Sequence, residues 1–422
     1  MNNWYLHNGF VFRNRQLSYE SILVLDGRIV AFGSEAQKMR QRSTVSIMDF
    51  DAAGCVICHG FIDLHTHLRE PGYSSKETIA TGTKAAAAGG FTMVSAMPNT
   101  NPPLDSVERL EIMQQLVYRN AQVKVNLVAA VTQNRAGEKL VDISQLANRG
   151  IKLFSDDGDP VAAEVMPQAM EQIAAAKAVL VNHLEEKSLV CPGFFADAIP
   201  ASSEYLMLKR DLQIAARARC HYHAAHLSCK ESVEMICTAK QQGLQVTSEV
   251  TPHHLTLTID DITYPEGNYQ MKPPLRTEED RQALIEGLRL GIIDAIATDH
   301  APHGSEKENG LYSGSPFGVT GLETAFPALY TRLVLTGAIT LEQLLTVLTQ
   351  GPGKVLNVDA DLLIGVPADL VVLDLNCRRR VEADSFYSKG KNSPFLGQVL
   401  QGWPVLTLVD GEEKYSAKES KY

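Results

Sequence analysis

Two histidines and an arginine lie at the end of an apolar run in the first quarter of the chain. Residues 60–72 read GFIDLHTHLREPG. Side chains alternate between the two faces of a β-strand, so His65, His67 and Arg69 share one face. Imidazole is a common nitrogen ligand of zinc, and a strand would hold two of them side by side. The segment predicts a metal site; two histidines that only form hydrogen bonds in a polar cleft are the alternative.

Eight strand-like runs, most of them followed by a helical stretch, must position such residues. They cover residues 60–67, 91–96, 123–131, 151–154, 178–182, 219–225, 244–250 and 292–297. This alternation predicts a (β/α)8 barrel of the TIM type, in which the carboxyl ends of all strands face one mouth. The polar residues that finish or follow the runs are His65, His67, Asn99, Asp156, His183, His226, Glu249 and Asp299. Any one of them alone could be a satisfied polar group, but their recurrence predicts an active site at the mouth.

Short strand-like runs also dominate both ends of the chain, for example at residues 21–25 and 405–409. The first 58 residues carry no cluster of catalytic residue types. We expect the two termini to meet, because the termini of a domain often lie close together at its surface. The predicted α/β architecture is therefore a barrel of residues 59–356 and a small β-sandwich domain of residues 1–58 and 357–422.

The composition is that of an ordinary globular chain, with 45% hydrophobic and 21% charged residues among 422. A net charge of -10 argues against nucleic acid as a partner. We find no apolar run long enough to cross a membrane and no signal peptide, so we expect a cytoplasmic protein with a small-molecule substrate. Seven scattered cysteines suit reduced, buried thiols, and the single CVIC segment at 55–58 favours packing over a zinc or redox site.

Longer motifs follow one another along nearly the whole chain. They are HTHLREPG (65–72), MPNTNP (97–102), FSDDG (154–158), SEVTPHHL (248–255), PPLR (273–276), ATDHAPH (297–303), FGVTGLE (317–323) and KGKNSPF (389–395). In this order they resemble the motifs of the bacterial, zinc-dependent dihydroorotases (class I type) of the amidohydrolase superfamily. The resemblance implies a metal-binding barrel with a small β domain made from both termini, and a homodimer. It also implies the reversible cyclisation of N-carbamoyl-L-aspartate to (S)-dihydroorotate and water, in de novo pyrimidine (UMP) biosynthesis.

The resemblance also implies a set of metal ligands. Carried over by position, they are His65, His67, Asp156, His183, His226 and Asp299. The first two histidines would share one zinc ion with Asp299, the other two would hold a second, and Asp156 would bridge the ions; one or two zinc ions are expected, with two favoured. Cations lower the pKa of a shared water enough to supply hydroxide. Asp299 would be the general acid and base.

Two of these positions have rivals. Lys152 lies on the fourth strand where related enzymes carry a carboxylated lysine, so it competes with Asp156 as the bridging ligand. His223 competes with His226, which can join the site only if its strand ends or bulges near Ala225. We expect His253 and His254 to have a structural or ligand-orienting role.

The substrate contacts that the resemblance implies are His67, Arg69, Asn99, Lys272, His303, Phe317 and Gly318. A planar guanidinium binds a carboxylate through two parallel hydrogen bonds, so Arg69, helped by Asn99, suits the free carboxylate of dihydroorotate. Dihydropyrimidinases and allantoinases act on rings without that group. Lys272 departs from the pattern, because the family commonly has asparagine there.

The sequence also allows two alternatives to dihydroorotase activity. One is another cyclic amidohydrolase, a dihydropyrimidinase or an allantoinase. The other is a catalytically inactive dihydroorotase-like subunit that binds a partner transcarbamoylase. All six expected metal positions are filled, which weighs against the inactive subunit.

Overall fold

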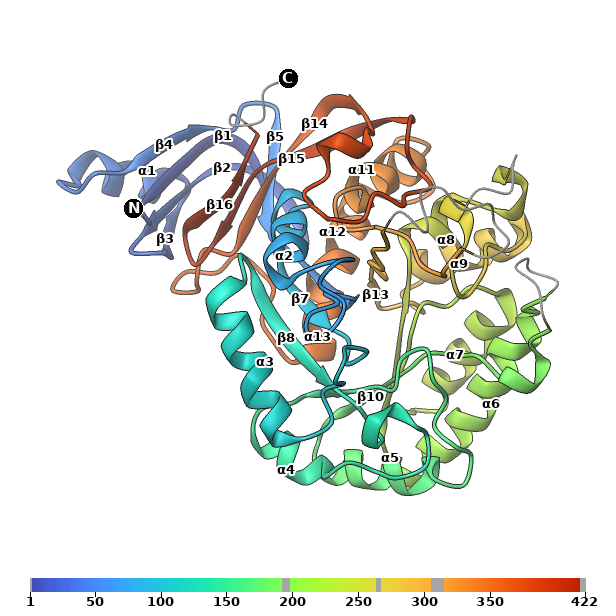
Figure 1. The fold of residues 1–422 in the computed structure, drawn as a ribbon. Coiled ribbons are helices and arrows are strands. Elements are labelled where there is room, and N and C mark those ends of the chain that lie inside the picture. Colours follow the sequence, from blue (N-terminus) through green and yellow to red (C-terminus); the bar gives the residue numbers. More distant parts are fainter. Residues whose placement is uncertain (1, 192–197, 263–266, 305–314, 418–422) are drawn as a thin grey trace.

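A barrel and a separate mixed sheet make up the protein, a computed structural model of which is shown in Figure 1. The structure describes residues 2–191, 198–262, 267–304 and 315–417. No helix within these ranges is long and apolar enough to cross a membrane.

The barrel contains eight parallel strands that neighbour one another in chain order. They are β6 (Phe61–Thr66), β7 (Phe91–Ala96), β8 (Lys124–Ala129), β9 (Leu153–Phe154), β10 (Val179–Asn182), β11 (His221–Ala224), β12 (Val246–Val250) and β13 (Ala295–Ile296). A parallel bridge between Thr66 and His300 joins the two ends of this sheet. The closed (β/α)8 barrel predicted from the alternating sequence is thus confirmed.

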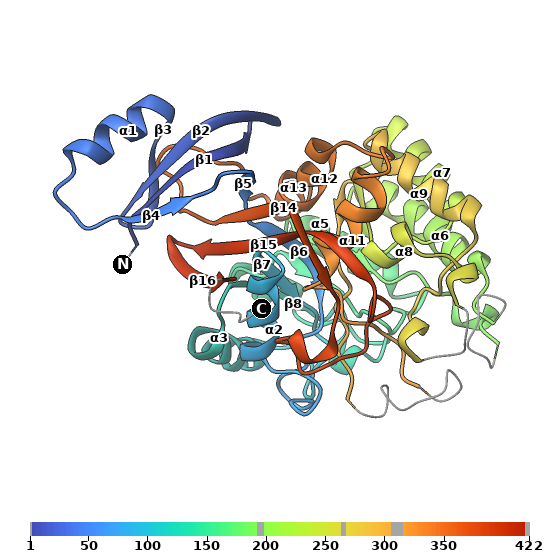
Figure 2. The same cartoon turned by 90° about the horizontal axis from the view of Figure 1, so that it is seen from above.

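Helices follow the strands and cover the outside of the barrel (Figures 1 and 2). They are α2 (Ile79–Ala88), α3 (Val107–Asn120), α4 (Ile143–Asn148), α5 (Met166–Ala175), α6 (Ala201–Ala218), α7 (Lys230–Gln241), α8 (Pro252–Thr256), α9 (Glu278–Arg289), α11 (Ala325–Leu329), α12 (Leu341–Leu348) and α13 (Gln350–Leu356). Helix α2 shows why they start where they do. The Thr78 hydroxyl accepts a hydrogen bond from the Thr81 backbone N–H at 3.1 Å, so the helix begins at Ile79.

Strands from both ends of the chain form the second sheet, in the order β16-β15-β14-β5-β1-β2-β3, with β4 beside β1. They are β1 (Trp4–Arg13), β2 (Gln16–Leu25), β3 (Arg28–Phe32), β4 (Met48–Asp51), β5 (Cys55–His59), β14 (Leu370–Arg380), β15 (Val399–Val409) and β16 (Glu412–Ser416). Helix α1 (Gly33–Arg42), which the sequence analysis did not predict, lies in the same region. The termini therefore meet in one β unit, as predicted; the residue limits of the two domains remain a prediction.

Residues 381–398 connect β14 to β15, and we call them the connecting segment. Although they lie within the predicted terminal domain, they contact the barrel. The Ser388 hydroxyl donates to the buried carboxylate of Glu77, and the Asn392 side chain bonds to Ala301, just after the last barrel strand. Part of the C-terminal region is thus fixed against the barrel mouth.

Candidate active site

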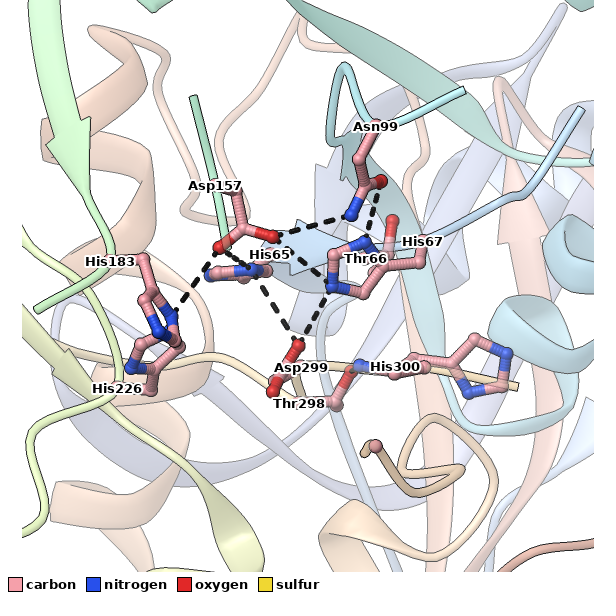
Figure 3. A network of polar contacts seen from close by, with 12 residues as sticks. His65, Thr66, His67, Asn99, Asp157, His183, His226, Thr298, Asp299 and His300 are labelled. Atoms are coloured by element: carbon pink, nitrogen blue, oxygen red, sulfur yellow. Dashed lines mark hydrogen bonds and ion pairs between the residues drawn. The ribbon is translucent and has the colours of Figure 1, made fainter. Parts of the chain in front are cut away.

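Four histidines and two aspartates from five different strand ends converge at the mouth of the barrel (Figure 3). They are His65 in β6, His67 just after it, Asp157 after β9, His183 after β10, His226 after β11 and Asp299 after β13. The ligand atoms of His65, His67 and Asp299 lie within 4.8 Å of one another, and so do those of His65, Asp157 and His226. The convergence predicted for residues 65, 67, 183, 226 and 299 is therefore present.

Asp157 lies between the two pairs of histidines. Its Oδ1 is 3.2 Å from Nε2 of His65 and 3.8 Å from Nδ1 of His183, and its Oδ2 is 3.6 Å from Nε2 of His67. Because it faces both pairs, it has the position expected of a bridging carboxylate.

Asp156 does not occupy that position, so the prediction that placed it there is wrong. Its Oδ1 accepts hydrogen bonds from the backbone N–H groups of Val131 at 2.8 Å and Thr132 at 3.1 Å, and its other oxygen accepts the Thr132 hydroxyl. The carboxylate of Asp156 thus satisfies backbone groups just after β8, and the next residue turns toward the histidines.

Lys152, the rival for the bridging position, is also directed elsewhere. Its Nζ donates a hydrogen bond to the carbonyl oxygen of Leu356 in α13 at 2.8 Å. The side chain is therefore tied to a helix and takes no part in the cluster of histidines.

His226 joins the site because β11 ends early, at Ala224. Its φ of 33° turns the chain out of the strand, and its Nε2 lies 2.9 Å from Nδ1 of His183. The rival His223 stays in the strand, where Thr247 and Glu249 occupy its two ring nitrogens at 2.8 and 3.1 Å. His226 is therefore the histidine of this strand that meets His183.

Asp299 lies close to the first histidine pair. Its Oδ1 is 3.0 Å from Nε2 of His67 and 3.6 Å from Nε2 of His65. Asp299 has a φ of 47° and Arg69 a φ of 60°, values in the left-handed region that non-glycine residues seldom adopt. Such conformations concentrate at functional sites, where the surrounding structure maintains them.

Two side chains behind the histidines orient the rings. Glu249, fully buried, accepts from Nδ1 of His65 at 3.1 Å and from Nε2 of His223 at 3.1 Å. Asn99 accepts from Nδ1 of His67 at 2.9 Å. A hydrogen bond on one ring nitrogen selects the tautomer and leaves the other nitrogen to act as a ligand. In both rings that other nitrogen, Nε2, faces the aspartates.

The charges of the cluster suit a cation. Burial disfavours the ionised form of Asp157, but His65, His67 and His183 outweigh burial and hold the pKa of this carboxyl well below its usual value. Burial, with repulsion from His183 and His65, lowers the pKa of His226 to about 3. Ionised carboxylates and a neutral imidazole are the protonation states that metal ligands need.

His65 differs from the other rings. Burial opposes its charged form, but Asp157, Glu249 and Asp299 together raise its pKa well above the usual value. A positive charge is therefore favoured between these carboxylates. A bound cation would supply the same charge.

One polar atom tests directly whether a metal fits. Nε2 of His65 is buried and makes no hydrogen bond within the described part of the chain, although buried polar atoms are nearly always paired. It faces carboxylate oxygens of Asp157 and Asp299 at 3.2 and 3.6 Å. Imidazole nitrogens and carboxylate oxygens are typical zinc ligands, so the donor set fits a zinc site.

A cavity of about 140 Å³ lies beside this cluster. Its walls contain five of the ligand candidates, His67, Asp157, His183, His226 and Asp299, together with Arg69, Asn99, Gly158, Lys272, Ala301, Phe317 and Gly318. All the predicted substrate contacts except His303 therefore line it. His303 lies next to it, with Nε2 donating to the carbonyl oxygen of Phe317 at 2.7 Å.

Lys272 is held at the cavity wall by a residue that the sequence analysis missed. Its Nζ donates to Oε1 of Glu185 at 3.0 Å and lies 4.7 Å from the centre of the Phe317 ring. Glu185 is 4% exposed, and its other oxygen is 4.0 Å from Nε2 of His183. The only sequence signal for Glu185 is its place two residues after His183, which is too weak to identify it.

Comparisons with known proteins agree on one family. The family model described as dihydro-orotase-like matches residues 54–232. The dihydroorotase of Bacillus caldolyticus is 46% identical over 421 residues, which cover 96% of this chain and 97% of that relative. The dihydroorotase of Listeria innocua is 43% identical over 429 residues and 99% of both chains.

Solved structures with the same fold include a hydantoinase and a dihydropyrimidinase. The L-hydantoinase (dihydropyrimidinase) of Arthrobacter aurescens superposes with a TM-score of 0.90 at 26% identity, covering 98% of this chain and 96% of its own. The dihydropyrimidinase of Brevibacillus agri superposes with a TM-score of 0.86 at 23% identity over 97% and 94% of the two chains. The second likeness shows the fold alone.

Proposed function

This chain belongs to the dihydroorotase family of cyclic amide hydrolases, and from that premise we propose how its residues interconvert N-carbamoyl-L-aspartate and (S)-dihydroorotate. The main support for this function is that Asp157 and Asp299 lie among four histidines and that Arg69 lines the same cavity. The site thus combines a metal-ligand set with a group that recognises a carboxylate. The reaction belongs to de novo pyrimidine biosynthesis.

The proposed cofactor is zinc, two ions per chain. His65, His67 and Asp299 would hold one ion and His183 and His226 the other, with Asp157 bridging them. Bound zinc would polarise the ring amide carbonyl and lower the pKa of the attacking water. Support for this assignment comes from the buried Nε2 of His65, which faces carboxylate oxygens of Asp157 and Asp299 and makes no hydrogen bond to a described residue, and from the lowered pKa of His226.

Substrate recognition is proposed to begin with charge. The guanidinium of Arg69 binds the free carboxylate of dihydroorotate, and His303 and the backbone at Gly318 contact the substrate beside it. The side-chain oxygen of Asn99 already accepts a hydrogen bond from His67. Its Nδ2, which lies 3.4 Å from Asp157, is therefore the group that would donate to the carboxylate of the substrate. Lys272 contributes a second positive charge at the wall.

Asp299 is the proposed general acid and base. In the hydrolytic direction it accepts a proton from the attacking water and delivers it to the ring nitrogen as the C–N bond breaks. In the biosynthetic direction it takes the proton of the carbamoyl nitrogen and returns it to the departing oxygen. Such transfer requires the carboxylate to lie within hydrogen-bond reach of the reacting atoms.

The test is turnover of dihydroorotate by the purified, zinc-loaded protein, compared with dihydrouracil and allantoin. We expect turnover of dihydroorotate only. Asp299→Ala should abolish it while circular dichroism stays unchanged, whereas Asp359→Ala, at an exposed aspartate outside the site, should leave it intact. Preference for either other ring would favour the dihydropyrimidinase or allantoinase alternative, and zinc binding without any turnover would favour the inactive subunit.

Two further proposals concern the setting of the enzyme. We propose a cytoplasmic homodimer, supported by the resemblance to bacterial dihydroorotases. Light scattering of the purified protein measures the oligomeric state, and cell fractionation measures the location. A monomer, or enzyme found outside the cytoplasm, would contradict these proposals without touching the chemistry.

A further inference from the structure

Two segments of the chain run side by side at the cavity. Residues 301–303 follow the last barrel strand, and residues 317–320 return to it. Ala301 N donates to Val319 O at 2.8 Å, and His303 Nε2 donates to Phe317 O at 2.7 Å. These segments carry His303 and Gly318, two of the proposed substrate contacts, so their relative position decides how substrate is held.

Asn392, in the connecting segment, joins the two segments from outside the barrel. Its side chain is completely buried. Nδ2 donates to the carbonyl oxygens of Ala301 at 3.2 Å and of Gly318 at 3.1 Å. Oδ1 accepts from the backbone N–H of His303 at 3.0 Å. One carboxamide thus binds both segments at the same time.

This pattern of bonds requires an amide. The two N–H groups of a carboxamide match two carbonyl oxygens, and its oxygen matches one backbone N–H. A carboxylate at the same place would set an oxygen, with no donor, against two carbonyl oxygens. Because the site is buried, water cannot supply the missing donors, and an unpaired buried polar group is costly.

The connecting segment itself is firmly held, so Asn392 acts from a fixed base. The backbone oxygen of Asn392 accepts from Thr320 N at 2.8 Å. Lys391 Nζ donates to the carbonyl oxygens of Phe386 and Ser388 at 2.7 and 2.9 Å. Gly390 lies so close to Pro302 that a Cβ added there would come within 2.6 Å of the proline Cβ. A rigid support of this kind preserves the geometry of a binding site.

We propose that Asn392 is a positioning residue for substrate binding, which sets His303 and the Gly318 backbone at the spacing that the substrate requires. This inference rests on the proposed function. Asn392 itself bonds to none of the six candidate metal ligands. Its loss therefore weakens substrate binding and leaves metal binding unchanged.

The first experiment compares Asn392→Asp with Ser393→Ala in the zinc-loaded enzyme. Ser393 is the matched control, since it is also buried in the same segment and, among the described residues, its hydroxyl accepts only the local Phe395 N–H, at 3.3 Å. We expect Asn392→Asp to raise KM for dihydroorotate about ten-fold, with kcat within about three-fold of the unchanged enzyme. Zinc content should be the same in all three proteins. An unchanged KM, or a loss confined to kcat or to zinc, would overturn the proposal.

A second measurement is independent of activity. Amide hydrogen exchange of residues 299–304 and 315–321 should become faster in Asn392→Ser than in the unchanged enzyme or in Ser393→Ala. If the unchanged enzyme does not turn over dihydroorotate, the proposed function fails, while exchange still decides on the role of Asn392. Should both Asn392 variants fail to fold, Asn392 is a folding residue and the positioning role is refuted.

Discussion

Strand β6 and the turn at residues 155–158 both place groups that face the candidate metal site, but by different means. In β6 the alternation of side chains directs His65, and His67 just beyond it, to one face, and Glu249 and Asn99 then fix the ring orientations. In the turn, no periodicity applies. Ser155 Oγ accepts from Asp157 N at 3.0 Å, and Arg135 donates to the Asp157 carbonyl oxygen.

The difference teaches where a ligand can be identified from its neighbours in sequence. A strand assigns faces by counting residues, whereas a turn assigns them through hydrogen bonds to distant groups, here Val131, Thr132 and Arg135. Adjacent, chemically identical aspartates can therefore have opposite roles. One anchors the turn, and the other faces the histidines.

Asp157→Ala should have the largest effect. It removes the carboxylate that faces both histidine pairs, so we expect fewer than two zinc ions per chain and a fall in kcat of about 10³-fold or more. Metal analysis measures the zinc content, and dihydroorotate turnover measures kcat. If Asp157→Ala keeps full zinc and activity, the turn does not supply a ligand and the comparison with β6 collapses.

Asp156→Ala should act on the turn rather than on the metal. Loss of its bonds to Val131, Thr132 N and the Thr132 hydroxyl leaves buried groups unpaired, which costs about 1–3 kcal/mol of unfolding free energy. Urea unfolding would measure this. Asp156→Asn, which keeps one acceptor oxygen, is the milder control; a greater loss of zinc in Asp156→Ala than in Asp157→Ala would reverse our assignment.

Glu249→Gln probes the strand side of the comparison. The carboxylate accepts from both His65 and His223, whereas an amide has one acceptor and would turn its NH2 toward the other ring. Removing such a supporting partner commonly lowers metal affinity about 10–100-fold. Competition for zinc with a chelator measures the change, and an unchanged affinity would show that strand geometry alone orients His65.

Lys152→Met should have the smallest effect. Within the part of the chain that the structure describes, the substitution removes one hydrogen bond, to Leu356, worth about 1 kcal/mol, and zinc content and turnover should stay the same. If Lys152 were instead a carboxylated, bridging ligand, activity would depend on bicarbonate, and Lys152→Met would cause the enzyme to lose zinc. Assays with and without added bicarbonate separate the two outcomes.

Much of the fold could be predicted because it depends on local patterns. The barrel strands follow apolar runs that end in polar residues, so the positions of His65, His67, His183 and Asp299 at one mouth follow from strand ends alone. His226 was predictable only with the condition that its strand stop near Ala225, and β11 does end at Ala224.

The rest depends on contacts between distant segments, which one sequence does not reveal. Asp156 and Asp157 differ only in which partners reach them. Glu185 is recognised as a site residue through its hydrogen bond with Lys272, which lies 87 positions away in the sequence. The motif at residues 389–395 was recognised by resemblance, but its contact with Ala301 and Gly318 spans 91 and 74 positions. Such pairings are set by the assembled barrel.

The mixed sheet has a consequence for how the protein is made. Strand β5, near the start of the chain, is hydrogen-bonded to β14, which begins at Leu370, and the Trp4 indole donates to the carbonyl oxygen of Gly411 at 2.8 Å. During synthesis, the first strands of the chain can therefore complete their hydrogen bonding only after the last strands have been made. A nascent chain halted inside the barrel would leave an edge of β5 unpaired, open to chaperones or to aggregation.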